Sequence, residues 1–204
     1  ALDFMEYKPR FLDKDMLGKR LSEMGRLGVK SIMYAGEGEP FLHKDIADII
    51  AHTKKAGIDV AVTTNGVFFD KRLADKTLSK LTWIKVSINA AAKKTYAKIH
   101  RSRPQDFYRV IRNMSYAAKL RRNKGYKCTL GMQIILLPEN YREIPLLAKK
   151  AKDIGMDYLV VKPYSQHPLS KTTRYKDIKY SQYLNLAQRL VKFDDKKFNV
   201  VFRI

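Results

Sequence analysis

Short apolar runs alternate with longer amphipathic stretches along almost the whole chain. The runs are rich in β-branched residues and end at Gly, Asn or Pro, which is typical of buried strands. Six strands are expected: Ser31–Ala35, Asp59–Thr64, Trp83–Asn89, Lys127–Leu136, Asp157–Lys162 and Phe198–Phe202. The stretches between them predict six helices: Asp15–Leu27, Lys44–Ala56, Lys71–Leu81, Phe107–Asn123, Tyr141–Ile154 and Tyr180–Phe193. Repeated strand–helix units indicate an α/β fold in which helices cover a parallel sheet.

Glycines punctuate this pattern. Gly28, Gly57, Gly125 and Gly155 each follow a predicted helix, where a residue with positive φ ends the helix without a Cβ clash. The strands are apolar on both faces, which fits burial on both sides. Periodicity alone leaves open whether the sheet closes into a barrel.

Ligands of parallel α/β sheets bind where the strands end at their carboxyl termini. Five groups of residues are expected at that edge: Gly36–Pro40, Thr63–Gly66, Ser87–Asn89, Leu137–Asn140 and Pro163–His167. Most of them carry good hydrogen-bonding groups, so the sequence predicts one polar edge.

Both ends of the chain break the pattern. The first helix has no convincing strand before it, and the last strand has no helix after it. We interpret residues 1–204 as one domain, a fragment cut at both ends.

Composition restricts the class of protein. The chain has 204 residues, 45% of them apolar, and a single cysteine, Cys128. That is enough for a sizeable core but excludes an internal disulfide. No run of about 18 apolar residues and no signal peptide are present, so we expect a cytoplasmic protein without a membrane partner.

The formal net charge is +21, from 41 Lys and Arg against 20 Asp and Glu. Such a charge attracts polyanions, including RNA, in a salt-dependent way. Solvated helix surfaces explain it more simply, because the charges recur along the whole chain instead of clustering. The clusters Arg101–Pro104 and Lys119–Lys124 are open to the same two interpretations.

The turn Gly36-Glu-Gly-Glu-Pro40 follows a predicted strand. Two glycines expose backbone carbonyls, and a carboxylate adds acceptors, so the turn suits a cationic donor such as an α-ammonium group. The alternative is a loop whose acids favour the next helix N-terminus.

Two further turns have a structural and a functional interpretation. Thr64-Asn-Gly66 is explained by an ordinary turn. In Ser87-Ile-Asn89 both polar side chains lie on one sheet face, where they could hold ribose or carboxylate oxygens or satisfy each other.

In this order, the motifs resemble the radical S-adenosylmethionine superfamily, in particular members with a SPASM or related auxiliary domain. The matching residues are Gly38–Pro40, Thr64–Gly66, Ser87–Asn89, Ile99–Arg101 and Leu136–Asn140. The resemblance covers the chain from about Leu17 to the last strand. It implies a partial (β/α)6 barrel of parallel strands with outer helices, here without its first strand.

The resemblance also implies an activity: a 4Fe–4S cluster cleaves S-adenosylmethionine to a 5′-deoxyadenosyl radical that abstracts hydrogen from a substrate. Its cofactor-binding positions correspond to Gly36, Glu37, Gly38, Glu39, Pro40, Asn65, Ser87, Asn89, Arg101 and Gln133. Glu39 and its neighbours would receive the methionine ammonium, and Arg101 a carboxylate. Implied partners are an unknown small-molecule or peptide substrate and an electron donor such as a flavodoxin or ferredoxin.

The family's three cluster cysteines are missing. Cys128 begins a strand far from the ligand edge, and is interpreted as a core residue. Spacing within the family places the three cysteines just upstream of Ala1. We therefore expect the chain as given to hold no cluster and no catalytic residue of its own.

Substrate contacts are expected at Lys162, Tyr164 and His167, although a proline-punctuated loop explains each of them. His43, His52 and His100 lack metal-ligand spacing. The rival function is a non-catalytic basic α/β module that binds RNA or another polyanion. A third interpretation, an ordinary barrel enzyme with a phosphorylated substrate, is the least favoured, because the sequence has no glycine-rich phosphate loop.

Overall fold

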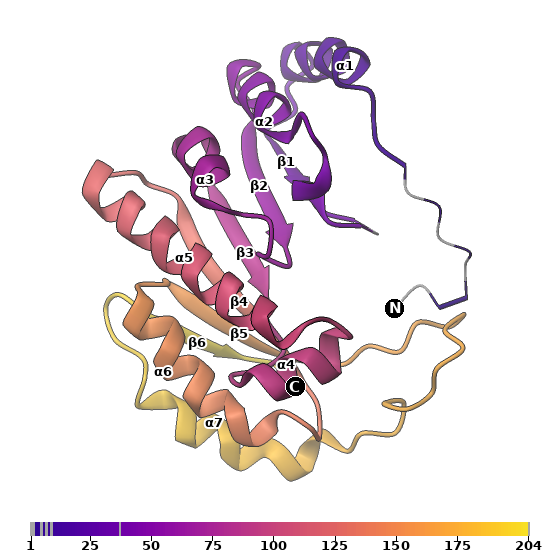
Figure 1. Cartoon of the computed structure of the whole chain (residues 1–204), viewed down its shortest axis with the longest axis vertical. Helices are drawn as coiled ribbons and strands as arrows, with labels where there is room; N and C mark the ends of the chain where they lie inside the picture. Colours follow the sequence, from indigo (N-terminus) through magenta and orange to yellow (C-terminus); the bar gives the residue numbers. More distant parts are fainter. Residues whose placement is uncertain (1–2, 5, 7, 9, 37, 204) are drawn as a thin grey trace. The chain divides into compact units, whose positions relative to one another are not determined.

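The computed structural model describes residues 3–4, 6, 8, 10–36 and 38–203. Six parallel strands form one open sheet in the order β1-β2-β3-β4-β5-β6, with helices around it, so the α/β class is confirmed (Figure 1). The strands are β1 (Ser31–Tyr34), β2 (Asp59–Thr64), β3 (Trp83–Ser87), β4 (Thr129–Leu136), β5 (Tyr158–Pro163) and β6 (Asn199–Phe202). Each lies within or overlaps one of the six predicted strands.

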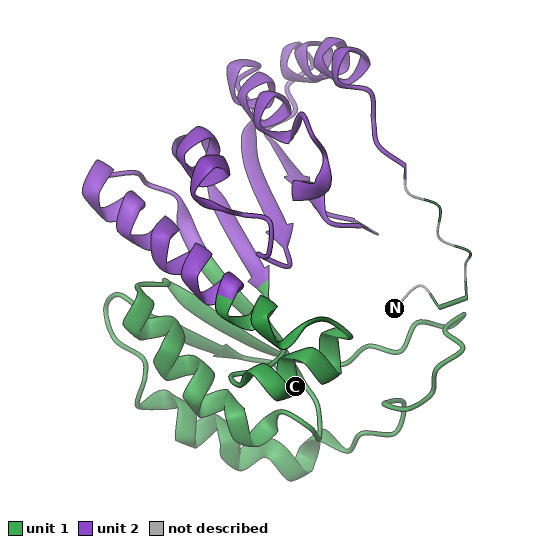
Figure 2. Cartoon of the chain, viewed as in Figure 1, with its two compact units in different colours: residues 1–8, 87–108, 131–204 green, residues 9–86, 109–130 purple. Residues whose placement is uncertain are grey.

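The chain divides into two compact units (Figure 2). Unit 1 comprises residues 1–8, 87–108 and 131–204, and unit 2 comprises residues 9–86 and 109–130. Each unit has fully buried apolar side chains, such as Val161 in unit 1 and Val62 in unit 2.

Unit 2 packs its helices against β1, β2 and β3 (Figure 1). They are α1 (Lys14–Arg26), α2 (Ile46–Lys55), α3 (Lys71–Thr77), the 3₁₀ turns η1 (Pro40–Leu42) and η2 (Leu78–Lys80), and most of α5 (Pro104–Lys124). Asp13 and Asp70 cap α1 and α3, because their carboxylates accept hydrogen bonds from Met16 N (2.8 Å) and Leu73 N (2.9 Å).

Unit 1 holds most of β4, all of β5 and β6, and the helices after them. These helices are α4 (Lys93–His100), α6 (Ile144–Ile154), α7 (Leu184–Val191) and the turns η3 (Tyr141–Glu143) and η4 (Tyr180–Tyr183). α6 contacts both β5 and α7. Ile144 and Leu147 of α6 are fully buried, so this helix covers one face of the sheet.

The two faces of unit 1's strands differ in burial. On β5, Leu159 and Val161 are fully buried, whereas Val160 and Lys162, which alternate with them, are partly exposed. On β4, Gln133 is partly exposed between fully buried neighbours. The expectation of equal burial on both faces was therefore wrong here, because helices cover only one face. Gln133 and Lys162 lie on the other, open face.

Helix α4 lies outside the six predicted helices. It has eight residues, and Tyr96 is its only buried side chain among those described, so its sequence carries little helical periodicity. A contact with Glu143, a residue distant in the chain, stabilises the start of this helix. Glu143 Oε2 accepts hydrogen bonds from Ala91 N (2.8 Å) and Ala92 N (3.0 Å), and Thr95 Oγ1 donates to Glu143 Oε1. A carboxylate from a distant loop thus caps the helix.

Other boundaries differ by a few residues. Strand β3 ends at Ser87 instead of Asn89, because side chains occupy the backbone groups of Asn89. Gly28, Gly57, Gly125 and Gly155 have φ between 64° and 89°, which confirms their role at helix ends. Among the described residues before Lys14 there is no strand. Within the described ranges, no helix combines the length and hydropathy needed to cross a bilayer.

Candidate functional site

The carboxylate of Glu39 is the centre of the glycine–glutamate turn in unit 2. Its Oε1 accepts hydrogen bonds from Thr64 Oγ1 (2.5 Å) and Phe41 N (3.1 Å), and its Oε2 accepts one from Asn65 N (2.7 Å). A carboxylate offers about four acceptor positions, so about one remains at Oε2. Glu39 therefore joins the turn after β1 to the end of β2, and most of its acceptor positions are used by protein donors.

Backbone groups make up the rest of this turn. Gly36 has φ 143°, and a Cβ built on it would meet nothing within 4 Å. Gly36 and Gly38 are exposed, and no described residue donates a hydrogen bond to their carbonyls. Pro40 opens η1. Glu37 lies outside the described residues. The turn thus presents free carbonyls, the acceptors an ammonium group requires.

Asn65 and Gly66 end β2 in a tight turn. Asn65 Oδ1 accepts a hydrogen bond from Val67 N (2.9 Å), which forms an Asx turn. Gly66 has φ 76°, and a Cβ there would lie 2.9 Å from Val86 Cγ1. Buried Asn113, which the sequence pattern did not reveal, donates to Gly66 O (2.9 Å) and Val67 O (3.1 Å). The turn interpretation is therefore right, and the Asn65 amide nitrogen remains for a ligand.

Asn89, at the end of β3 in unit 1, is held by three hydrogen bonds. Its Oδ1 accepts from Ile135 N (2.9 Å), its N–H donates to His100 Nε2 (3.1 Å), and its carbonyl accepts from Asn140 Nδ2 (3.0 Å). Because Oδ1 is occupied by a donor, the amide orientation is fixed. Asn89 therefore presents Nδ2 as a hydrogen-bond donor. The hydroxyl of Ser87, two residues earlier on the same face, has no partner among the described residues.

His100 is the acceptor for the Asn89 backbone. Its ring stacks on buried Tyr96, with 4.3 Å between ring centroids. Burial lowers the pKa of His100 to about 4, so the ring is neutral at neutral pH. A neutral ring keeps Nε2 as an acceptor, which the bond from Asn89 N requires.

Acidification is expected to destabilise the folded protein through His100. An unfolded histidine titrates near 6.5, whereas the folded pKa is about 4. The stabilisation that comes from the neutral His100 ring is therefore complete above about pH 6.5. It is lost as the pH falls towards about 4, which lowers the free energy of unfolding by at most about 3 kcal/mol. Urea unfolding across this range should show the loss in wild type. His100→Gln keeps an acceptor but does not titrate. An equal pH dependence in both proteins would contradict this assignment.

The Asn140 side chain makes three hydrogen bonds that the sequence analysis did not predict. It is fully buried. Its Oδ1 accepts from Leu137 N (2.9 Å), and its Nδ2 donates to Asn89 O and to Ile135 O (2.8 Å). One side chain therefore joins the ends of β3 and β4. The quoted Leu136–Asn140 motif contained this residue, but no local signal showed its partners.

Gln133 and Lys162 lie on the open face of the sheet in unit 1. Ile135, two residues after Gln133, pairs with Lys162 in the β4–β5 register. Both polar side chains are partly exposed, and no described hydrogen bond engages them. They remain available to a ligand on that face.

Arg101 ends α4 with φ 51°, the one positive φ among described residues other than glycine. Such a conformation costs a non-glycine residue about 1–2 kcal/mol. Nearby, Glu139 Oε1 accepts from Arg174 Nη2 (2.5 Å) and Tyr175 OH (2.9 Å). Burial and the Glu139 carboxylate raise the pKa of Tyr175, while the positive charges of Arg174 and Arg101 oppose that rise. Arg101 thus influences Tyr175 through its charge.

Tyr164 and His167 lie in the loop after β5. The Tyr164 ring packs edge-on against Tyr175 at 5.5 Å, and its N–H donates to Tyr180 OH (2.7 Å). His167 stacks on Phe4 at 4.7 Å, and its Nδ1 accepts from Leu169 N (3.1 Å). Tyr164 therefore joins the Glu139 cluster, whereas His167 supports its own loop.

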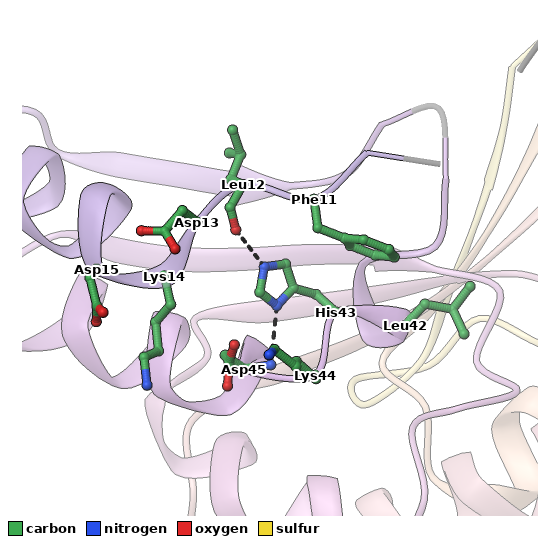
Figure 3. A pocket seen from close by; sticks show the side chains of 9 residues that line it. All are labelled: Phe11, Leu12, Asp13, Lys14, Asp15, Leu42, His43, Lys44 and Asp45. Carbon is green, nitrogen blue, oxygen red and sulfur yellow. Dashed lines mark hydrogen bonds between the residues drawn. The ribbon is translucent and has the colours of Figure 1, made fainter. Parts of the chain in front are cut away.

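A pocket of about 580 Å³ lies in unit 2 between the segment before α1 and the start of α2 (Figure 3). The His43 side chain lines this pocket. Its Nε2 lies 2.8 Å from Leu12 O, and its Nδ1 accepts a hydrogen bond from Asp45 N (3.1 Å). Both ring nitrogens are used, so His43 joins two chain segments and is no metal ligand. No described group of three or more His, Cys, Asp or Glu could hold a metal, and Cys128 is buried.

The sequence matches one family model. Residues 3–151 match the model described as the Radical SAM superfamily. A probable GTP 3′,8-cyclase of Methanopyrus kandleri is 27% identical over 154 residues, covering 74% of this chain and 47% of that protein. A tungsten-containing aldehyde ferredoxin oxidoreductase cofactor-modifying protein of Pyrococcus furiosus is 23% identical, covering 74% and 42%. The chain spans less than half the length of these relatives.

Solved structures share the fold. Streptococcus suis SuiB bound to S-adenosylmethionine is 19% identical with a TM-score of 0.70, covering 98% of this chain and 46% of that chain. SuiB bound to its precursor peptide SuiA is 20% identical with a TM-score of 0.68, covering 98% and 44%.

Proposed function

The chain belongs to the radical SAM superfamily, and from that premise we propose that it is the S-adenosylmethionine-binding core of a radical enzyme of the SPASM or twitch type. Members of this family use S-adenosylmethionine together with a 4Fe–4S cluster. When bound, these groups supply a 5′-deoxyadenosyl radical for hydrogen abstraction. The protein binds and orients the cofactor and excludes water.

In each unit taken by itself, the described residues offer donors and acceptors that suit groups of S-adenosylmethionine. The single observation that carries the proposal is the Glu39 turn, where the carboxylate accepts three protein hydrogen bonds and the Gly36 and Gly38 carbonyls of the same turn are exposed. We assign the methionine ammonium to those carbonyls. Ser87 and the Asn89 amide nitrogen, both donors, suit ribose or carboxylate oxygens, and Arg101 suits a carboxylate. Asn65 and Gln133 complete the proposed cofactor contacts.

The same residues do not fit an iron–sulfur cluster. Cluster ligation uses cysteine thiolates, and the 204 residues contain one cysteine, which is buried beside β4. We therefore derive no step that uses the cluster. The placement of the cluster cysteines outside these 204 residues stays a prediction.

We propose a small molecule or a peptide as substrate, contacted by Lys162 and Tyr164 on unit 1. Relatives that carry the name GTP 3′,8-cyclase, and the SuiB complex with its precursor peptide, support these two classes. Radical generation also requires an electron donor, for which a flavodoxin or ferredoxin remains our proposal. The rival, a non-catalytic module that binds RNA, is supported by the net charge of +21.

Equilibrium binding of S-adenosylmethionine to the chain tests the proposal. We expect saturable binding, weakened about three- to tenfold in Ser87→Ala through the loss of one hydrogen bond. Ser31→Ala, at the amino end of β1, is the matched control and should bind as wild type. If a folded chain binds no S-adenosylmethionine, the proposed function is wrong and RNA binding should be measured next.

A further inference from the structure

Three buried side-chain atoms have no hydrogen-bond partner among the described residues. They are Ser102 Oγ, Glu139 Oε2 and Gln166 Oε1, and all three belong to unit 1. Buried polar atoms are nearly always hydrogen-bonded in folded proteins, so each exception needs an explanation. Glu139 is the strongest case, because an unsatisfied carboxylate oxygen is more costly to bury than a hydroxyl or an amide oxygen.

The two carboxylate oxygens of Glu139 have different surroundings. Oε1 accepts hydrogen bonds from Arg174 Nη2 (2.5 Å) and Tyr175 OH (2.9 Å), whereas Oε2 is buried without a partner. Arg174 therefore contacts one oxygen through one nitrogen. A guanidinium group that faces a carboxylate squarely makes two parallel N–H···O bonds and satisfies both oxygens. The ion pair between Arg174 and Glu139 thus leaves one oxygen of the carboxylate unused.

The cation that pairs with Glu139 comes from an exposed loop. Residues 164–179 join β5 to η4, and no helix or strand lies among them (Figure 1). Loops longer than about 15 residues without secondary structure are uncommon and are usually functional. The Arg174 side chain is 58% exposed, whereas that of Glu139 is only 14% exposed. The carboxylate is therefore the buried member of the pair, and its cation is the accessible and replaceable member.

An aromatic ring lies beside the same carboxylate. The guanidinium carbon of Arg174 is 5.3 Å from the centroid of the Tyr175 ring, and the Tyr164 ring packs edge-on against Tyr175 at 5.5 Å. A guanidinium group stacks favourably on an aromatic face. Tyr164 is also one of the proposed substrate contacts. Unit 1 therefore combines a buried carboxylate, a free acceptor oxygen and an aromatic face next to a proposed substrate residue.

We propose that the Glu139 carboxylate is a binding site for the guanidinium group of a ligand, which replaces Arg174 there. The incoming group contacts both oxygens, so Oε2 gains a donor in the bound state. Placing this group on the substrate rests on the proposed function, whereas the binding itself does not. The net charge of +21 disfavours cations at long range, but salt screens charges beyond about 8–10 Å, so contact with the carboxylate decides binding.

Titration of the chain with N-acetyl-arginine amide tests the proposal. We expect a dissociation constant of about 1 mM for wild type and about tenfold tighter binding for Arg174→Ala, because that variant lacks the competing internal guanidinium. Arg142→Ala is the matched control. Arg142 also lies over a tyrosine ring, 5.5 Å from the centroid of Tyr141, but its Nε donates to the Tyr141 hydroxyl. This control removes the same charge and should bind the probe as wild type does.

Two further comparisons are made in Arg174→Ala, where binding is tighter. Adding Glu139→Gln should weaken binding of the arginine probe at least about tenfold, through loss of the charge and of one acceptor oxygen. N-acetyl-citrulline amide has nearly the shape of the arginine probe but no charge, and it should bind at least about tenfold more weakly. The citrulline comparison does not change Glu139, so it decides the question even if Glu139→Gln unfolds.

A capped hexapeptide with one central arginine distinguishes two sources of the guanidinium group. Tighter binding than the single residue assigns the group to a peptide, and equal binding assigns it to a small molecule. The proposal is overturned by any of three results: no gain in affinity in Arg174→Ala, equal binding of arginine and citrulline, or a preference for guanosine, whose base also presents a planar pair of N–H donors.

S-adenosylmethionine affinity, measured in parallel, separates this site from the proposed function. It should be unchanged in Arg174→Ala, because Arg174 is not among the proposed cofactor contacts. If wild type binds the arginine probe but no S-adenosylmethionine, the proposed function is wrong and the guanidinium site stands. The reverse result would reject the guanidinium site alone.

Discussion

Glu39→Ala should destabilise the protein by about 2–4 kcal/mol and reduce S-adenosylmethionine binding below detection. The carboxylate accepts three hydrogen bonds, from Phe41 N, Thr64 Oγ1 and Asn65 N. Bonds to a charged acceptor each contribute about 1.5–3 kcal/mol, less where solvent reaches them. Without them nothing fixes the turn that presents the Gly36 and Gly38 carbonyls. Urea unfolding and equilibrium dialysis measure the two effects.

Glu39→Gln is the matched variant. Its amide keeps one acceptor oxygen but directs an NH₂ group at a backbone or hydroxyl donor, so it should lose most of the stability as well. If the turn only caps the end of β2, both variants would unfold more easily while the folded fraction bound S-adenosylmethionine normally. That result would remove Glu39 from the cofactor site.

Asn140→Ala is expected to lower the free energy of unfolding by about 3–5 kcal/mol, one of the largest effects of any single change in unit 1. The substitution leaves the buried Leu137 N and the part-buried Asn89 O and Ile135 O without this partner. Each unsatisfied group costs about 1–3 kcal/mol. For a domain of this size the melting temperature should fall by about 6–20 °C.

Asn140→Asp is the control for this change. Aspartate keeps the acceptor for Leu137 N but cannot donate to the two carbonyls, so its destabilisation should be comparable or larger. Asn140→Ala should also weaken S-adenosylmethionine binding, because Asn89 loses one of its three constraints. A melting temperature within about 2 °C of wild type would show that water or a rearranged loop replaces the Asn140 bonds.

Much of the fold could be predicted from the sequence. Strands were found because β-branched runs such as Asp59–Thr64 are short, apolar and bounded by turn residues. Helix ends were found because only glycine adopts φ near 80° without cost at Gly28 and Gly57. Helix α4 was missed because its stability comes from Glu143, a partner about 50 residues away.

The motifs at the strand ends were also visible in the sequence, since turn chemistry at Gly36–Pro40, Thr64–Gly66 and Ser87–Asn89 is local. The hydrogen-bond partners of the residues within these motifs were not visible. Only the tertiary structure decided that Glu39 accepts hydrogen bonds from the end of β2, and that Asn89 is oriented by His100 and Asn140. Hydrogen bonds between residues distant in the chain depend on strand order and register, which local patterns do not encode.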